Sequence, residues 1–521
     1  MSSHGETMDV TVTRPDALAT GGPTGARGWS DRRRLAVAAA VAGGVSAVVS
    51  ATGSWIPSLW GDEAASLLSS QRSFGSLFAM LGHVDAVHGF YYVLLHLWVN
   101  VAGTSPFAVR LPSAVAVGVA AAAVVWMCGR MRSLRLAVLA GLVAAILPRL
   151  TYAGEEARAY AFDAALCAVL CAIVAEIALR QRPGSRLWVA YAAVLTVATY
   201  MFLYDLLMSV AVGAFLLATP GARRRLRAWA IATGTATVIA SPLVVFAVLE
   251  RSQVAYLAHR DEVTGGSVFE QMWFGSVPFA LVAWACILIA VADLVVRAVR
   301  RRRAVGALRP RRPEVVVLAL CWLVLPAGIL IGSSPLVAGF TARYATMAAP
   351  AAAVLIAAGI DRVTRRTWMA VAASAVVVAV ALPVWAGQRG AYAMNESDWN
   401  EIAATVHAHD RHGDGVVFDE GVRPSRRTRL AMDTDPAAFA GLKDVTLRSP
   451  YPDNPTWHDT TYSVSTAASL GRFHGVSRVW LIEYALPGHV DDWGVAALKR
   501  LGYHLTAHYE EHRSVTYLFT R

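Results

Sequence analysis

The sequence Trp60-Gly61-Asp62-Glu63 comes directly after the first long apolar segment of the chain, which runs from about residue 35 to residue 56. Three consecutive arginines, at positions 32–34, precede that segment. Because basic residues favour the cytoplasmic side of a membrane helix, the segment is predicted to cross the membrane and to leave Asp62 on the external side. A carboxylate held there can take a proton from a hydroxyl group that lies at the membrane surface.

The composition of the whole chain favours a membrane protein. Of its 521 residues 56% are hydrophobic, and the mean hydropathy is +0.46. Apolar runs of about 20 residues alternate with short basic loops, which is typical of a polytopic helical membrane protein. The net charge of +11 comes largely from arginine clusters between these runs. Membrane topology therefore accounts for the charge, and nucleic-acid binding is not predicted.

We expect eleven membrane spans, near residues 35–56, 107–127, 135–151, 159–179, 187–204, 206–219, 228–249, 277–296, 314–332, 344–360 and 368–386. Residues 91–102 are also apolar, but a crossing there would put every later basic loop on the wrong side. This segment is short and contains His96, Trp98 and Asn100, so we predict that it lies at the external interface without crossing. The N-terminus is then cytoplasmic and the C-terminus is outside.

These patterns divide the chain into three regions. Residues 1–31 are expected to form a disordered cytoplasmic tail, and residues 32–387 a membrane domain with an external loop at 57–106. The polar region 388–521 is predicted to be a small extracytoplasmic α/β domain. Its expected elements are helices at 399–409 and 493–501 and strands at 415–418, 479–484 and 514–519.

The external loop 57–106 contains the first group of candidate site residues. Asp62 and Glu63 lie near its start, and Asp85 and His88 follow later in the same loop. Carboxylate and imidazole groups at one surface can move protons to and from a reacting molecule. The alternative is structural, because Asp62 could cap a helix that begins after Pro57.

Two further groups of candidate residues are predicted on the same side of the membrane. Glu155, Glu156, Arg158 and Tyr160 follow the third span, where charged side chains are costly unless they face water or a polar cavity. An ordinary loop is the alternative for this group.

Arg343 and Tyr344 lie at the start of the tenth span. An arginine in this place can bind a phosphate through two parallel hydrogen bonds. An arginine that only snorkels to the interface is the alternative here.

Three parts of the sequence together resemble the GT-C glycosyltransferases related to protein O-mannosyltransferases and to the lipid A aminoarabinose transferase. They are the pair Asp62-Glu63, the string from Asp85 to His96 that is followed by Trp98, Gly103 and Arg110-Leu111-Pro112-Ser113, and the segment Glu156-Ala157-Arg158-Ala159-Tyr160. The resemblance covers roughly the first two-thirds of the chain, and no motif is identified in the C-terminal region.

The resemblance implies a GT-C-like fold and an inverting transfer of a sugar from a polyprenyl-phosphate carrier to an external acceptor. It implies that Asp62 is the general base and that Glu63 holds the acceptor or shapes the loop. The remaining candidates are expected to bind substrate, with Arg158 or Arg343 stabilising the departing phosphate; they are Asp85, His88, Tyr91, Glu155, Glu156, Arg158, Tyr160, Arg343 and Tyr344. The expected acceptor is a cell-envelope glycan, lipid or protein.

The arginine-rich, lysine-poor composition indicates a GC-rich, actinobacterial source, for which mannose or arabinose is the expected sugar. No sequence pattern indicates a cofactor, and a divalent metal is left open. Other classes of protein remain as alternatives: a transporter or flippase of lipid-linked glycans, a non-catalytic membrane scaffold or sensor, and a polymer ligase. A transporter would more often contain paired halves with broken helices, and the sequence has no internal repeat.

Overall fold

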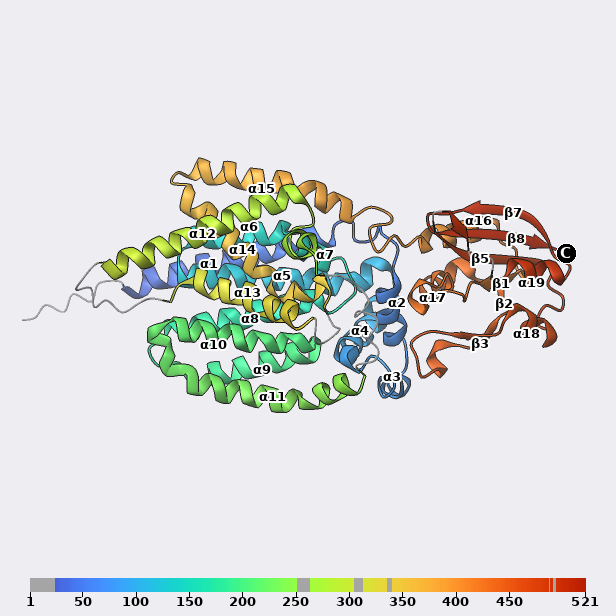
Figure 1. The fold of residues 1–521 in the computed structure, drawn as a ribbon, viewed down its shortest axis with the longest axis horizontal. Helices are drawn as coiled ribbons and strands as arrows, with labels where there is room; N and C mark the ends of the chain where they lie inside the picture. The colour runs from blue at the N-terminus through green and yellow to red at the C-terminus, as the bar shows by residue number, and fades with distance from the viewer. Residues whose placement is uncertain (1–23, 251–262, 304–312, 335–339, 487, 491–492) are drawn as a thin grey trace, which may run out of the picture.

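The computed structural model describes residues 24–250, 263–303, 313–334, 340–486, 488–490 and 493–521 (Figure 1). Most of the predicted tail, residues 1–23, lies outside these described residues. The first helix, α1, begins at Thr24, within the last part of the region expected to form the tail.

The larger part of the molecule is a bundle of helices that run along its longest axis (Figure 1). The helices are α1 (Thr24–Ala51), α5 (Pro106–Met131), α6 (Leu134–Ile146), α8 (Tyr160–Leu179), α9 (Ser185–Met201), α10 (Met208–Ala218), α11 (Leu226–Leu249), α12 (Val277–Arg303), α13 (Val315–Ser333), α14 (Ala349–Val363) and α15 (Thr367–Gln388). Each predicted span corresponds to one of them. Among the described residues, eight helical segments are long and apolar enough to cross a membrane. The predicted polytopic helical fold is therefore confirmed.

Close packing of α1 against α5 depends on small residues. A Cβ atom on Gly43 would lie 2.9 Å from the carbonyl oxygen of Gly118, and one on Gly118 would lie 2.6 Å from the carbonyl oxygen of Gly43. Membrane helices lack a hydrophobic drive toward one another, so such backbone contact supplies the van der Waals packing that holds them together.

Three short helices lie between the bundle and the C-terminal domain (Figure 1). They are α2 (Gly61–Ser70), α3 (Phe74–Leu81) and α4 (Gly89–Ala102), and they make up most of the external loop expected at 57–106. α4 contains the segment predicted to lie at the interface. It lies beside α2 at this end of the bundle, a position that favours the non-crossing interpretation.

The C-terminal domain contains a mixed β-sheet with the strand order β2-β1-β5-β8-β7. β1 (Gly415–Phe418) is parallel to β2 (Lys443–Asp444) and to β5 (Arg478–Leu486), whereas β8 (Ser514–Thr520) is antiparallel to β5 and to β7 (His504–Glu510). The helices α16 (Trp399–His409) and α19 (Val495–Arg500) are also present, so the five predicted elements are all found. β7 and four short strands, β2, β3 (Leu447–Ser449), β4 (Thr460–Thr461) and β6 (His489–Val490), were not predicted.

The C-terminal domain shares an apolar core with the external loop. Leu67 on α2 and Leu95 on α4 belong to the same buried cluster as Ile402 on α16, Phe418 on β1 and Leu430 on α17 (Leu430–Thr434). Burial of apolar side chains is the main favourable term in such an association. The loop and the domain therefore form one packed unit.

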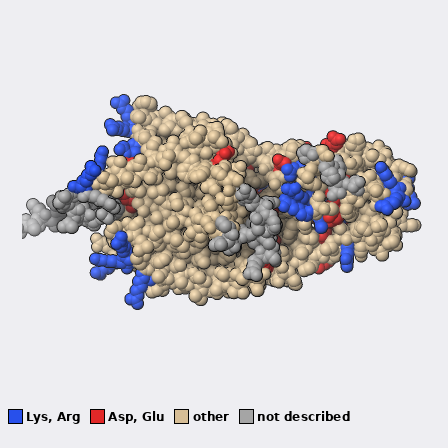
Figure 2. Space-filling view, in the orientation of Figure 1, with Lys and Arg blue, Asp and Glu red and all other residues tan. Residues whose placement is uncertain are grey.

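Charged side chains are unevenly distributed over the surface. Figure 2 shows lysine and arginine side chains gathered at the end of the bundle that is opposite the C-terminal domain, while the middle of the bundle carries almost no charge on this face. A surface of this kind suits a bilayer around the middle of the bundle.

Candidate functional site

Asp62 lies in the first turn of α2 and forms an ion pair with Arg343. Its Oδ2 is 2.7 Å from Nη1 of Arg343, and both side chains are 25% exposed. The helix begins after Trp60, which occupies the N-cap position without a side-chain hydrogen bond. Asp62 is therefore inside the helix, and the alternative that it caps the N-terminus is wrong.

The electrostatic surroundings keep Asp62 ionised. Burial acts to raise the pKa of Asp62, but the positive charges of Arg343 and Arg158 outweigh burial, and the pKa is lowered from its usual value. A carboxylate that is ionised at neutral pH can accept a proton, which is the first requirement of a general base.

Arg343 is held by aromatic rings as well as by Asp62. It lies in η6 (Ala342–Ala348), with its Cζ 5.3 Å from the ring centroid of Trp60 and 5.8 Å from that of Tyr160. The ring centroid of Tyr344 lies 6.3 Å from that of Tyr160, so Tyr344 extends this aromatic group. A cation between aromatic faces is stabilised while its outer N–H groups stay available to an anion. Tyr160 and Tyr344 thus support the arginine from the bundle side.

Glu63, the second carboxylate expected to be catalytic, is fully buried. Its Oε1 accepts hydrogen bonds from Arg110 Nε at 2.8 Å and from the backbone N–H of Ala157 at 2.8 Å, and its Oε2 is 2.6 Å from Arg110 Nη2. Both oxygens are thus engaged, so the geometry gives Glu63 no contact with an acceptor. It agrees with the other role expected of Glu63, which is to shape the loop.

Arg158 joins α2 to the later part of the external loop. Its Nη1 donates to the carbonyl oxygen of Asp62 at 3.3 Å and to Ser66 Oγ at 3.2 Å, and its Nη2 donates to Nε2 of His88 at 3.2 Å. Burial lowers the pKa of His88 to about 3, and the nearby Arg158 charge acts in the same direction. The imidazole is therefore neutral and accepts a hydrogen bond.

Asp85 and Tyr91 support this arrangement at a distance from the cavity. Asp85 accepts a hydrogen bond from the Tyr92 hydroxyl at 3.2 Å, and its backbone has a φ of 59°, a left-handed conformation at the turn before α4. Tyr91 is buried and packs edge-on against Phe162, with 6.0 Å between the ring centroids. Neither Asp85 nor Tyr91 lines the cavity described below.

Glu155 and Glu156 are buried between α7 (Pro148–Ala153) and α8. Glu155 Oε2 lies 3.0 Å from Nη1 of Arg389, yet burial raises the pKa of Glu155 to about 8. Burial also raises the pKa of Glu156 to about 7, and the positive charge of Arg343 is the largest effect that acts against this rise. Neither glutamate lines the cavity described next.

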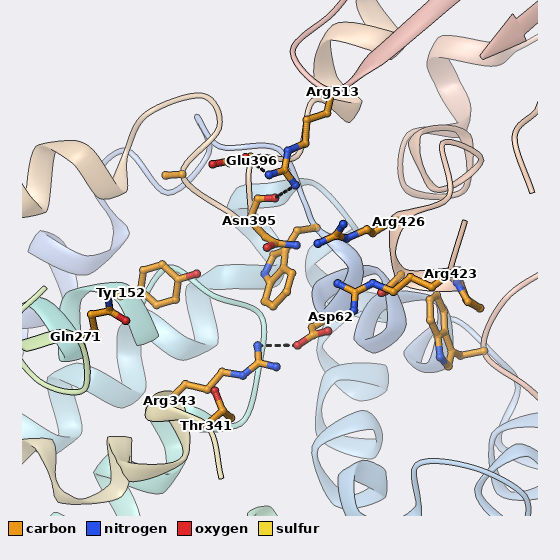
Figure 3. A pocket seen from close by; sticks show the side chains of 15 residues that line it. Asp62, Tyr152, Gln271, Thr341, Arg343, Asn395, Glu396, Arg423, Arg426 and Arg513 are labelled. Carbon is orange, nitrogen blue, oxygen red and sulfur yellow. Dashed lines mark hydrogen bonds and ion pairs between the residues drawn. The ribbon is translucent and has the colours of Figure 1, made fainter. Parts of the chain in front are cut away.

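A cavity of about 990 Å³ lies between the bundle end and the C-terminal domain (Figure 3). Asp62 and Arg343 line it from the membrane side, whereas Arg423, Arg426 and Trp457 line it from the C-terminal domain. Of the nine substrate-binding candidates predicted from sequence, Arg343 alone lines this cavity among the described residues. Of the two arginines expected to stabilise a departing phosphate, Arg158 and Arg343, it is therefore Arg343 that lines the cavity.

The C-terminal arginines are the site residues that the sequence prediction missed. A signal for them was present, because Arg423, Arg426 and Arg427 form a basic run in a region predicted to be external. The rule that explains basic cytoplasmic loops does not account for basic residues there. For metals, the described part of the chain contains no group of three or more His, Cys, Asp or Glu side chains that could hold an ion.

Comparison with known proteins shows which solved structures share this fold. No protein-family model and no curated protein matches the chain. ArnT from Cupriavidus metallidurans, in the apo state and bound to undecaprenyl phosphate, is similar over 95% of this chain and 98% of its own, with 15% identity and a TM-score of 0.55.

The oligosaccharyltransferase AglB from Archaeoglobus fulgidus, in complex with an inhibitory peptide and a dolichol-phosphate, is similar over 87% of this chain and 70% of its own, with 11% identity and a TM-score of 0.52. The structural resemblance to the GT-C glycosyltransferases that the sequence predicted is thus confirmed, and the chain has a GT-C-like fold.

Proposed function

We propose that this protein is a membrane glycosyltransferase that moves a sugar from a polyprenyl-phosphate carrier to an acceptor at the outer face of the membrane. The observation that carries the proposal is the ionised Asp62, paired with Arg343 on the membrane side of a cavity, in a GT-C-like fold. The solved structures of ArnT with undecaprenyl phosphate and of AglB with a dolichol-phosphate support a donor of this class.

In the proposed reaction the acceptor oxygen forms a bond to the anomeric carbon while the bond from that carbon to the phosphate oxygen breaks. Asp62 takes the proton of the acceptor hydroxyl, and the polyprenyl phosphate leaves with the bonding electrons. Arg343 stabilises the negative charge on the departing phosphate. If Arg343 turns from Asp62 to that phosphate, Asp62 loses its nearest positive charge and becomes a stronger base.

A single displacement inverts the anomeric carbon. Retention would need a second carboxylate as a nucleophile, about 5–5.5 Å from the first. The adjacent carboxylate, Glu63, is fully bonded to Arg110 and Ala157 and is not available. The proposed transfer is therefore inverting, as expected from the sequence resemblance.

The proposed topology places the C-terminal domain outside and the N-terminus in the cytoplasm. It is supported by the arginines at the end of the bundle opposite the domain (Figure 2) and by the position of α4 beside α2. Labelling of single cysteines in intact cells tests it. A cysteine at Arg132 should be protected from a membrane-impermeant reagent and one at Arg500 should react; the reverse result contradicts the topology.

The proposed activity is tested with purified protein in lipid nanodiscs, polyprenyl-phosphate mannose or arabinose as the donor, and cell-envelope glycans, lipids or proteins as the acceptor. We expect release of polyprenyl phosphate, together with a new glycosidic bond whose anomeric configuration, measured by NMR, is opposite to that of the donor. Movement of the intact donor across the bilayer of proteoliposomes without formation of a glycosidic bond would show a flippase instead.

A further inference from the structure

The C-terminal domain contacts the start of α2, next to Asp62. Its short helix η7 (Pro424–Arg426) packs against Gly61, and a Cβ atom added to Gly61 would lie 2.2 Å from the carbonyl oxygen of Ser425. Only a glycine permits this approach, since any other residue would push the two segments apart. η7 is thereby held at a fixed distance from Asp62.

This contact places two arginines of the C-terminal domain in the cavity. Arg423 and Arg426 both line it, and Figure 3 shows them on the side of Asp62 that is opposite Arg343. Arg423 is exposed and Arg426 is half-buried. Asp62 therefore lies between a cation of the membrane part and two cations of the C-terminal domain.

On the domain side of the cavity, Arg426 has no carboxylate partner among the described residues. Arg343 is paired with Asp62, and Arg513 is paired with Glu396. Arg426 donates a hydrogen bond to the hydroxyl of Tyr484 at 3.3 Å. Its Nε is buried and has no hydrogen-bond partner among the described residues. An anion at this wall would supply that partner.

We propose that Arg423 and Arg426 bind an anionic group, a carboxylate or a phosphate, of the acceptor and so hold the acceptor hydroxyl at Asp62. This inference rests on the proposed function. The donor phosphate is anchored in the bilayer and meets Arg343 from the membrane side, so the acceptor approaches from the domain side. Guanidinium groups bind carboxylates and phosphates through paired hydrogen bonds, which fix orientation as well as position.

The test measures binding of three glycosides to the full-length protein in nanodiscs of neutral lipid: octyl glucoside, octyl glucuronide and octyl glucoside 6-phosphate. We expect the anionic glycosides to bind at least about tenfold more tightly than the neutral one. The double variant Arg423→Ala/Arg426→Ala should lose this preference, and Arg423→Lys/Arg426→Lys should keep part of it. The matched control Arg500→Ala removes an exposed arginine of the same domain outside the cavity and should behave as wild type.

Preference for the glucuronide alone would identify a carboxylate as the ligand, and preference for the 6-phosphate alone would identify a phosphate. Equal binding of neutral and anionic glycosides by the wild type, or an unchanged preference in the alanine double variant, overturns the inference.

Binding of polyprenyl phosphate to the same variants separates this inference from the proposed function. The alanine double variant should retain its affinity for polyprenyl phosphate, which also shows that it is folded. If it loses that affinity while its unfolding temperature is unchanged, the two arginines belong to the donor site and the inference is wrong. If the wild type transfers no sugar from any polyprenyl-phosphate donor but keeps the arginine-dependent preference, the proposed function fails and the anion site stands.

Discussion

The Asp62–Arg343 pair and the Glu63–Arg110 pair start from adjacent residues of α2, but they differ in exposure and in bonding. Both side chains of the first pair are 25% exposed and line a cavity. Both side chains of the second pair are fully buried, and Glu63 also accepts a hydrogen bond from the backbone N–H of Ala157. Successive residues of an α-helix point about 100° apart, so one of the two carboxylates can face the cavity while the other faces the protein. The difference supports the proposal that the first pair takes part in the reaction and that the second stabilises the loop.

Asp62→Asn should have the largest effect on activity. The amide keeps the shape of the side chain but cannot take a proton, so transfer should fall by about 10²- to 10⁴-fold with little change in unfolding temperature. The measurement is the initial rate of sugar transfer in nanodiscs. Asp435→Asn, at an exposed carboxylate of the C-terminal domain, is the matched control and should leave the rate unchanged. A normal rate for Asp62→Asn would remove Asp62 from the mechanism.

Glu63→Ala should act on stability. It leaves the buried guanidinium of Arg110 without its carboxylate, and breaking such a pair costs about 3–5 kcal/mol. Unfolding in detergent should show this loss, whereas Asp62→Ala should be close to wild type because Arg343 remains partly exposed to water. If the two variants unfolded alike, the proposed division of roles between the pairs would be refuted.

Arg343→Ala should lower the affinity for the donor or the turnover. Loss of one charge-assisted contact to phosphate costs about 1.5–3 kcal/mol, which corresponds to about 10- to 150-fold in donor affinity or turnover. Arg343→Lys should fall between alanine and wild type, because it keeps the charge and loses the planar fork. Kinetics against donor concentration measure both effects. Equal kinetics for all three proteins would make Arg343 an interfacial anchor only.

The pH dependence of transfer should show the smallest effect. The lowered pKa of Asp62 keeps the carboxylate ionised until the pH falls below its usual value of 3.8, so the acid limb of kcat/KM should lie below that pH. Arg343→Ala removes a positive charge that lowers the pKa of Asp62, so the limb should move to higher pH. Arg500→Ala should leave the limb in place. A limb that is the same in all three proteins would mean that another group is titrating.

The helical framework could be predicted because each of its signals is local. Long apolar runs define the bundle, and α16 and β1 have the bounds expected from their patterns. β7 was missed although Leu505, Ala507 and Tyr509 alternate with polar residues along it. It lies at the edge of the sheet and none of its residues is fully buried, so its apolar signal is weak. β2, β4 and β6 are two residues long, which is too short for any periodic pattern.

The site was only partly predictable because it depends on contacts between distant segments. Asp62 and Arg343 were both identified, since charged residues next to apolar spans are unusual. The sequence could not show that Glu63 faces Arg110, because that depends on how α2 is rotated against α5. Nor could it bring Arg423 and Arg426 to Asp62, since the approach of η7 depends on the packing of a whole domain.

The way in which α2 is fixed to the C-terminal domain has a consequence for protein engineering. Arg72, just beyond the end of α2, is buried and donates to the carbonyl oxygens of Tyr451, Asn454 and Thr456, while Gly61 at the other end contacts Ser425. A fusion at residue 388 that replaced the C-terminal domain alone would leave a buried guanidinium without acceptors and a helix start without its neighbour. A chimera intended to change acceptor specificity must therefore exchange residues 57–82 together with residues 388–521.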